Sequence, residues 1–195
     1  MKLNWNRQLF AEAAFSRVRR TRRWKRAAAH FFSMDALSQA DRAVLLGIYT
    51  LESYYRPLPC RLAEYGLLLW EGLLAPFRGR QVKNYTIGPC QIGLSTLLRY
   101  RNYDVPLHCQ RVPLPSFREF LLLFRAAGTA YSAELLAYRL QDAMQQAKER
   151  YPARINLQCR LIGQEFAGRY SYGLMLERAY GYIRDAYPPA VQNRQ

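Results

Sequence analysis

The chain has 195 residues, of which 50% are hydrophobic and 14% aromatic, so it can bury a core and is not a wholly disordered chain. Its formal net charge of +15 predicts an anionic partner, such as nucleic acid, a lipid surface or a polyanionic cell wall. Its apolar runs fall short of the roughly 18 residues that a membrane-spanning helix needs.

Positive charge is concentrated near the N-terminus, where arginine or lysine fills seven of the ten positions from 17 to 26. We expect residues 1–37 to form a basic extension in which this row is a solvated or disordered arm. Such an arm could dock on an anionic cell-envelope surface, on secretion machinery or on a membrane surface. The basic residues are not followed by the apolar core of a signal peptide, so no export signal is recognised.

The first helix of the expected domain begins at a capping pattern formed by Ser38 and Asp41. Apolar residues recur along it at helical spacing, and Pro57 predicts its end near Arg56. A second apolar helix is expected over residues 62–74. Three glycines and a proline within residues 78–93 then indicate a loop or a short β-like turn.

The second half of the chain also reads mainly as helix. Three prolines predict irregular structure over residues 102–115. Further helices are expected from Ser116 to Leu123, from Ser132 to Arg150, over residues 154–166 with Gly168 as the stop, and from Ser171 onward. The fold class predicted is therefore mainly α, with a domain over residues 38–187 and a C-terminal tail over residues 188–195.

The four cysteines do not indicate a metal site. Cys60, Cys90, Cys109 and Cys159 form no Cys-x-x-Cys pair, and the chain has only two histidines. Four buried thiols are the default expectation, and two disulfides in one of three pairings are the alternative outside the cell. No metal or cofactor is predicted.

Glu52 stands out because it shares a helix face with Leu45, Ile48 and Tyr55. Carboxylates are rarely buried without a partner, so an ion pair with Arg56, Arg61 or another core-facing arginine is one interpretation. The other is a general acid, because burial raises the pKa of a carboxyl group and lets it donate a proton near neutral pH.

Three segments together resemble the lytic transglycosylase and goose-type lysozyme family. Glu52-Ser53 matches a helix that ends in Glu-Ser, and Gly88, Gln91 and Ile92 match a Gly-Leu-Met-Gln-Ile loop, with Thr86 in the place of a serine. Phe166-Ala167-Gly168, followed by Tyr170 and Tyr172, stands where the family has Tyr-Asn-Gly and a tyrosine. The resemblance spans residues 38–186 and implies a lysozyme-like helical domain.

The resemblance implies cleavage of the β-1,4 bond between N-acetylmuramic acid and N-acetylglucosamine in peptidoglycan. Glu52 would be the single general acid and base, because the substrate's own C6 hydroxyl replaces a second carboxylate. The substrate-binding residues that it implies are Ser53, Thr86, Gly88, Gln91, Tyr170 and Tyr172. The glycan strands would be the partner, and the cell envelope or periplasm the location.

Two other classes of protein remain open. Ala167 replaces the family's asparagine, so the domain could bind a glycan or a partner protein without cleaving it. The charge, Trp24 within the basic row and the fifteen tyrosines are what a nucleic-acid-binding protein would have. Against the latter, the sequence has no helix-turn-helix, zinc or aromatic-basic binding signature.

Overall fold

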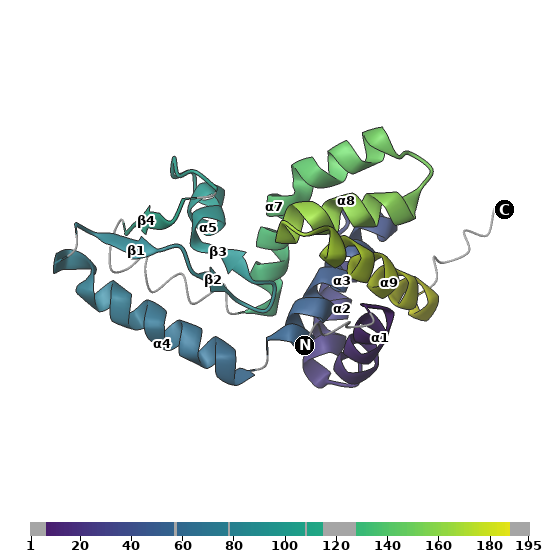
Figure 1. The fold of residues 1–195 in the computed structure, drawn as a ribbon, viewed down its shortest axis with the longest axis horizontal. Helices are drawn as coiled ribbons and strands as arrows, with labels where there is room; N and C mark the ends of the chain where they lie inside the picture. The colour runs from purple at the N-terminus through teal and green to yellow at the C-terminus, as the bar shows by residue number, and fades with distance from the viewer. Residues whose placement is uncertain (1–6, 57, 78, 108, 115–127, 188–195) are drawn as a thin grey trace, which may run out of the picture. The chain divides into compact units, whose positions relative to one another are not determined.

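A computed structural model describes residues 7–56, 58–77, 79–107, 109–114 and 128–187. The described part is mainly helical, as the sequence predicted (Figure 1). The helix expected from Ser116 and the tail over residues 188–195 lie outside the described residues. None of the described helices is long and apolar enough to cross a membrane.

The chain divides into two compact units. Unit 1 comprises residues 1–55 and 140–195, and unit 2 comprises residues 56–139, so that the boundary falls inside helix α7. The helices are α1 (Arg7–Val18), α2 (Arg22–Phe32), α3 (Gln39–Tyr55), α4 (Leu58–Leu74), η1 (Ala75–Phe77), α5 (Leu94–Tyr100), α7 (Thr129–Arg150), α8 (Ile155–Ala167) and α9 (Tyr170–Ala186). The strands are β1 (Gln81–Lys83), β2 (Thr86–Ile87), β3 (Ile92–Gly93) and β4 (Arg111–Pro113).

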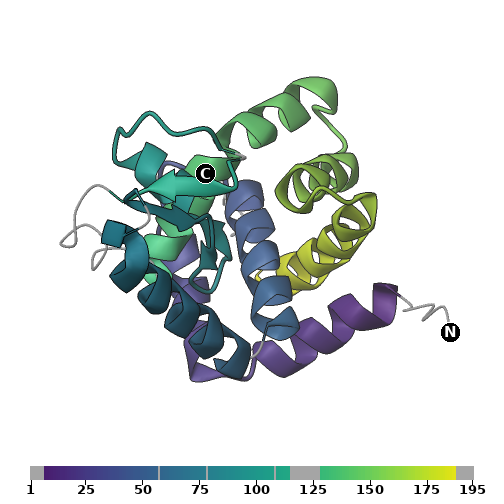
Figure 2. The ribbon, with the colours of Figure 1, turned by 60° about the vertical axis from the view of Figure 1, so that its left-hand side comes forward.

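The basic N-terminal segment is folded, so the expectation of a disordered arm is wrong for residues 7–32. Thr21 caps α2 by accepting a hydrogen bond from the Trp24 backbone N–H at 3.2 Å. Trp24 is buried, and its Nε1–H donates to Thr50 Oγ1 on α3 at 2.8 Å. Both α1 and α2 contact α3, and Figure 2 shows the purple α1 beside the blue α3 and the yellow α9. The seven basic side chains remain exposed.

Helix α3 begins where Ser38 and Asp41 predicted it. Ser38 Oγ donates to Asp41 Oδ2 at 2.6 Å and accepts from the Asp41 backbone N–H at 3.2 Å. Lys148 on α7 reaches the same Asp41 oxygen at 2.6 Å, which compensates the burial of this carboxylate. The helix then buries ten further residues before it ends at Tyr55.

Helices α8 and α9 pack closely because glycine lies at their contact. A Cβ atom on Gly173 would lie only 2.2 Å from the Arg160 carbonyl oxygen, and one on Gly163 would lie 2.7 Å from Gly173 Cα. Gly168 ends α8 with φ +66°, the left-handed conformation that glycine adopts without strain. The expected stop at Gly168 is therefore confirmed, whereas α9 begins at Tyr170, one residue before the predicted cap Ser171.

Unit 2 contains the β-like segment that the glycines indicated. Strand β2 pairs antiparallel with β3, and β1 pairs antiparallel with β4, with Val82 opposite Val112. Strand β4 lies in the stretch expected to be irregular, and Pro113 at its end stands opposite Gln81. Helix α5 was also not predicted, although it buries Leu94, Leu97 and Leu98.

The four cysteines are free thiols. Cys90 and Cys159 are buried, Cys109 is half-buried and Cys60 is exposed, so the expectation of four buried thiols is wrong for Cys60. Burial, reinforced by the nearby Glu177 carboxylate, raises the pKa of the Cys159 thiol. Because the thiolate is the reactive form, this cysteine is chemically inert in the folded protein.

The glycine contact between α8 and α9 predicts opposite effects for two substitutions in one helix. Gly173→Ala forces a methyl group onto the Arg160 carbonyl and should lower the free energy of unfolding by about 1–3 kcal/mol. Gly181→Ala, which meets nothing within 4 Å, should raise it by about 0.5–1 kcal/mol. Urea denaturation measures both changes. Equal changes in the two variants would contradict the close packing.

The exposure of the thiols predicts an order of reaction with Ellman's reagent. Cys60 should react first in the folded protein, whereas Cys90 and Cys159 should react only after denaturation. Cys60→Ser should remove the fast phase and leave the slow phases unchanged. A fast phase that persists in this variant would show that one of the other thiols is accessible.

Candidate active site

Glu52 lies in the last turn of α3 and is only 8% exposed. The phenol of Tyr172, in the first turn of α9, donates a hydrogen bond to Glu52 Oε1 at 2.8 Å. The two residues are 120 positions apart and both belong to unit 1. The fold thus brings together two segments that the sequence singled out, the one that contains Glu52 and the one that contains Tyr172.

The position of Tyr172 depends on the packing of the C-terminal helices. Its ring contacts that of Phe166, the last buried residue of α8, with centroids 5.5 Å apart. The left-handed Gly168 then turns the chain, so that α9 begins at Tyr170 and Tyr172 lies in its first turn, five residues after Ala167 ends α8. Because α9 contacts α3, the phenol reaches the end of α3 where Glu52 lies.

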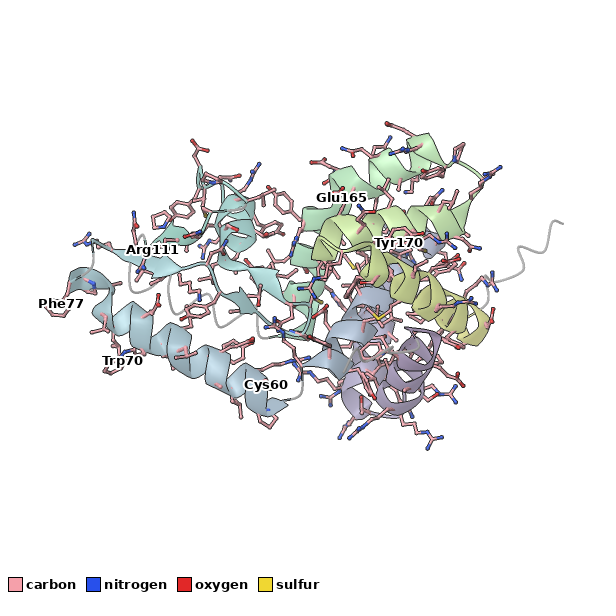
Figure 3. The ribbon with its side chains drawn as sticks, in the orientation of Figure 1. Cys60, Trp70, Phe77, Arg111, Glu165 and Tyr170 are labelled. Atoms are coloured by element: carbon pink, nitrogen blue, oxygen red, sulfur yellow. The ribbon has the colours of Figure 1, made fainter. Side chains whose placement is uncertain are left out.

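Ser53 and Tyr170 flank this pair in the sequence but differ in their surroundings. Ser53 Oγ is buried and has no hydrogen-bond partner within the described part of the chain. A buried hydroxyl without a partner is uncommon and leaves a donor available to a ligand. Tyr170 is 55% exposed at the start of α9, and Figure 3 labels it where α9 begins.

Arg56, considered above as a partner for Glu52, forms an ion pair with Glu64 of α4. Asp104 is exposed. Glu71 accepts hydrogen bonds from the Lys83 backbone N–H at 2.7 Å and from the Tyr85 phenol at 3.3 Å. Burial raises the pKa of Tyr85, and the nearby Glu71 carboxylate raises it further. Glu64 and Glu71 therefore have structural roles within unit 2.

The second motif forms the tight connection between β2 and β3 in unit 2. Gln91 is buried with φ +52°, an unusual backbone conformation for a residue with a side chain. Its amide explains how the conformation is held: Oε1 accepts from Thr86 Oγ1 at 2.7 Å, and Nε2 donates to the Gly88 carbonyl at 3.2 Å. Gly88 itself has φ +76°, which favours glycine at this position.

Two further residues that the sequence did not single out hold this turn. Tyr65 of α4 accepts a hydrogen bond from the Gly88 backbone N–H at 3.0 Å. Ser132 of α7 accepts one from the Cys90 backbone N–H at 3.3 Å. The signal for Tyr65 was its spacing, because Tyr65, Leu68 and Gly72 follow one face of α4 at intervals of three and four residues. For Ser132 the sequence showed only a position near the start of a helix, which does not indicate a contact with Cys90.

The predicted site residues therefore fall into two sets. Glu52, Ser53, Tyr170 and Tyr172 belong to unit 1, where Glu52 and Tyr172 are in contact. Thr86, Gly88 and Gln91 belong to unit 2, where they form one hydrogen-bonded turn. Among the described residues, no group of three or more histidine, cysteine, aspartate or glutamate side chains could hold a metal ion.

No protein-family model, curated protein or solved structure matches the chain. The assignment of a function therefore depends on the residues themselves and on the geometry that they form.

Proposed function

We propose that this protein is a peptidoglycan lytic transglycosylase with a lysozyme-like domain, in which Glu52 is the only general acid and base. The observation that carries the proposal is the hydrogen bond from the Tyr172 phenol to the buried Glu52 carboxyl group. It joins the first and third of the three segments that resemble the family. A chance resemblance between isolated short motifs does not require such a contact.

The reaction assigns two successive tasks to one carboxyl group. In the first task, protonated Glu52 transfers its proton to the glycosidic oxygen as the bond from that oxygen to C1 of N-acetylmuramic acid breaks. The resulting carboxylate then removes the proton of the C6 hydroxyl, whose oxygen attacks C1 and closes a 1,6-anhydro ring. Glu52 is protonated again at the end, and no water is consumed.

Tyr172 acts on this cycle by positioning the carboxyl group. Its hydrogen bond holds one oxygen of Glu52, and the ring contact with Phe166 holds the phenol in turn. A glutamate side chain in a single orientation loses less conformational freedom when the substrate binds. The family's asparagine is replaced by Ala167 at the end of α8, so Tyr172 carries more of this orienting role.

Thr86, Gly88 and Gln91 would bind the sugar. Glycine at position 88 leaves the backbone open to close approach, and the amide of Gln91 is held by two hydrogen bonds before a ligand arrives. A preorganised polar group costs less entropy on binding than a mobile one. The net charge of +15 favours association with the anionic wall, and we place the activity in the cell envelope or periplasm.

One observation favours a second function. The seven basic side chains over residues 17–26 are all exposed, and none forms an ion pair within the described part of the chain. Such a surface on two folded helices could bind the phosphates of a nucleic acid. This alternative does not need Glu52, so one substitution separates the two functions.

Glu52→Gln should abolish the release of soluble muropeptides from purified peptidoglycan, because the amide cannot transfer a proton. The parent protein should release products that mass spectrometry identifies as 1,6-anhydro sugars. Glu165→Gln, which changes an exposed carboxylate on α8, is the matched control and should retain full activity. Products with reducing ends would indicate a lysozyme. No release by the parent, together with salt-sensitive DNA binding, would favour the nucleic-acid function.

Tyr172→Phe keeps the ring beside Phe166 but removes the hydroxyl that contacts Glu52. We expect kcat to fall roughly tenfold with little change in KM, because the lost hydrogen bond of about 1–1.5 kcal/mol orients the acid and does not bind the sugar. Tyr182→Phe, in the same helix, removes a hydroxyl from a ring stacked on Phe15 and should change neither constant. An equal loss in both variants would indicate a general effect on α9.

A further inference from the structure

Helix α4 is amphipathic, but unlike an ordinary surface helix it turns its polar side inward and its apolar side to the solvent. Its charged residues face the interior of unit 2 or lie half-buried: Arg61 is buried, Glu64 pairs with Arg56, and Glu71 bonds to β1. Tyr65 also points inward, to the Gly88 backbone. The polar side chains of the helix thus make their contacts within unit 2.

The outward side of α4 and of the following turn is uncharged. Every exposed residue from Pro59 to Phe77 is a proline, glycine, alanine, cysteine, leucine or aromatic residue. The large ones are Leu62 (60% exposed), Leu67 (53%), Leu69 (42%), Trp70 (61%), Leu73 (59%) and Phe77 (87%). Figure 3 shows Trp70 on the side of α4 that faces away from the strands and Phe77 at the end of the segment, in η1. A contiguous apolar face of this kind marks an interaction surface.

Three basic residues follow α4 in the chain and lie near its C-terminal part or in the β1–β4 ribbon. The Arg80 backbone N–H donates to the Ala75 carbonyl at 2.8 Å, and the Lys83 backbone N–H donates to Glu71 at 2.7 Å, which fixes both residues along the C-terminal part of the helix. Arg111 stands opposite Lys83 in the β1–β4 ribbon. All three side chains are exposed, and none has an ion-pair partner in the described ranges of the chain.

The charge decides between the possible occupants of the apolar face. A second copy of the chain would bring together two molecules that each carry a net charge of +15, which repel one another. An anionic surface is attracted by the same charges. A specific protein partner would need hydrogen bonds at intervals of about 100–200 Å² of interface. The indole N–H of Trp70 is the one strong donor among the exposed side chains from Pro59 to Phe77.

We propose that α4 is an interfacial helix that docks the protein on a bilayer containing anionic phospholipid. The helix has 17 residues and is about 25 Å long, and its charged residues all lie on the side away from the apolar face. It therefore lies parallel to the surface, with its leucines and Phe77 at the acyl boundary. Trp70 takes the interfacial position that tryptophan prefers, and Arg80 and Lys83, near the C-terminal part of the helix, meet the lipid phosphates.

The test measures binding of the full chain to vesicles of phosphatidylglycerol mixed with phosphatidylcholine, and to vesicles of phosphatidylcholine alone, by co-sedimentation. We expect binding to the mixed vesicles and weak binding to the neutral ones. The fluorescence of Trp70 supplies a second readout. Of the other two tryptophans, Trp24 is already buried and should not respond to lipid, and Trp5 is removed by the substitution Trp5→Phe. Its emission should shift to the blue on the mixed vesicles, and lipids brominated in the acyl chain should quench it.

The double variant Trp70→Ser/Phe77→Ser should bind the mixed vesicles at least about tenfold more weakly, because it removes the two largest apolar groups from the face. Leu107→Ser/Tyr138→Ser is the matched control: it removes two apolar side chains of unit 2 that are 37% and 39% exposed and lie outside α4. This control should bind like the parent, and circular dichroism should show unchanged helix content in both variants. Arg80→Gln/Lys83→Gln should weaken binding by about fivefold for each charge removed.

Three results would overturn the proposal. The first is the absence of vesicle binding by the parent. The second is equal binding by the parent and by Trp70→Ser/Phe77→Ser, which would assign the binding to basic residues elsewhere. The third is a dimer in sedimentation equilibrium that this double variant dissociates, which would assign the face to a second copy. Glu52→Gln should bind vesicles like the parent, so the outcome is separate from that of the peptidoglycan assay.

Discussion

The close contact between α8 and α9 is the constraint on which the candidate site depends. Gly173 lies against the Arg160 carbonyl at a distance that no side chain allows, and Gly163 faces it from α8. Arg160 and Glu177 then join the same two helices by an ion pair at 2.6 Å. Because α9 also contacts α1 and α3, its position determines where the Tyr172 phenol meets Glu52.

The structure uses its other buried or half-buried acidic groups differently. Asp41 is paired with Lys148, Glu64 with Arg56, and Glu71 with a backbone N–H and a phenol of unit 2. Each of these carboxylates holds two elements together, which is the usual reason to tolerate the desolvation of a charge. Glu52 lies in the last turn of α3 and accepts a hydrogen bond from the Tyr172 phenol, and the hydroxyl of the adjacent Ser53 has no hydrogen-bond partner among the residues that the structure describes. This contact is the observation behind the proposal that Glu52 exchanges a proton with a ligand.

The sequence predicted the elements whose local signals agree with one another. Ser38 and Asp41 marked the start of α3, Gly168 marked the end of α8, and the glycines of residues 78–93 marked the β-like segment. Helix α2 was missed because its basic residues obscured the spacing of Trp24, Ala27, Ala28 and Phe31, which is that of a buried helix face. Strand β4 was missed because Pro113 counted against a strand, although a proline is tolerated at the end of an edge strand.

What the sequence could not predict is which face of a helix is buried. Periodicity shows that α4 has an apolar and a polar side, and the ordinary expectation places the apolar side inward. Here the strands of unit 2 take up Glu71 and Tyr65 instead, so the leucines, Trp70 and Phe77 remain outside. Each large apolar side chain left in water forgoes about 1.5–3 kcal/mol of burial free energy. A helix with this composition is poorly explained by the stability of the isolated chain, and is well explained by a surface that covers it.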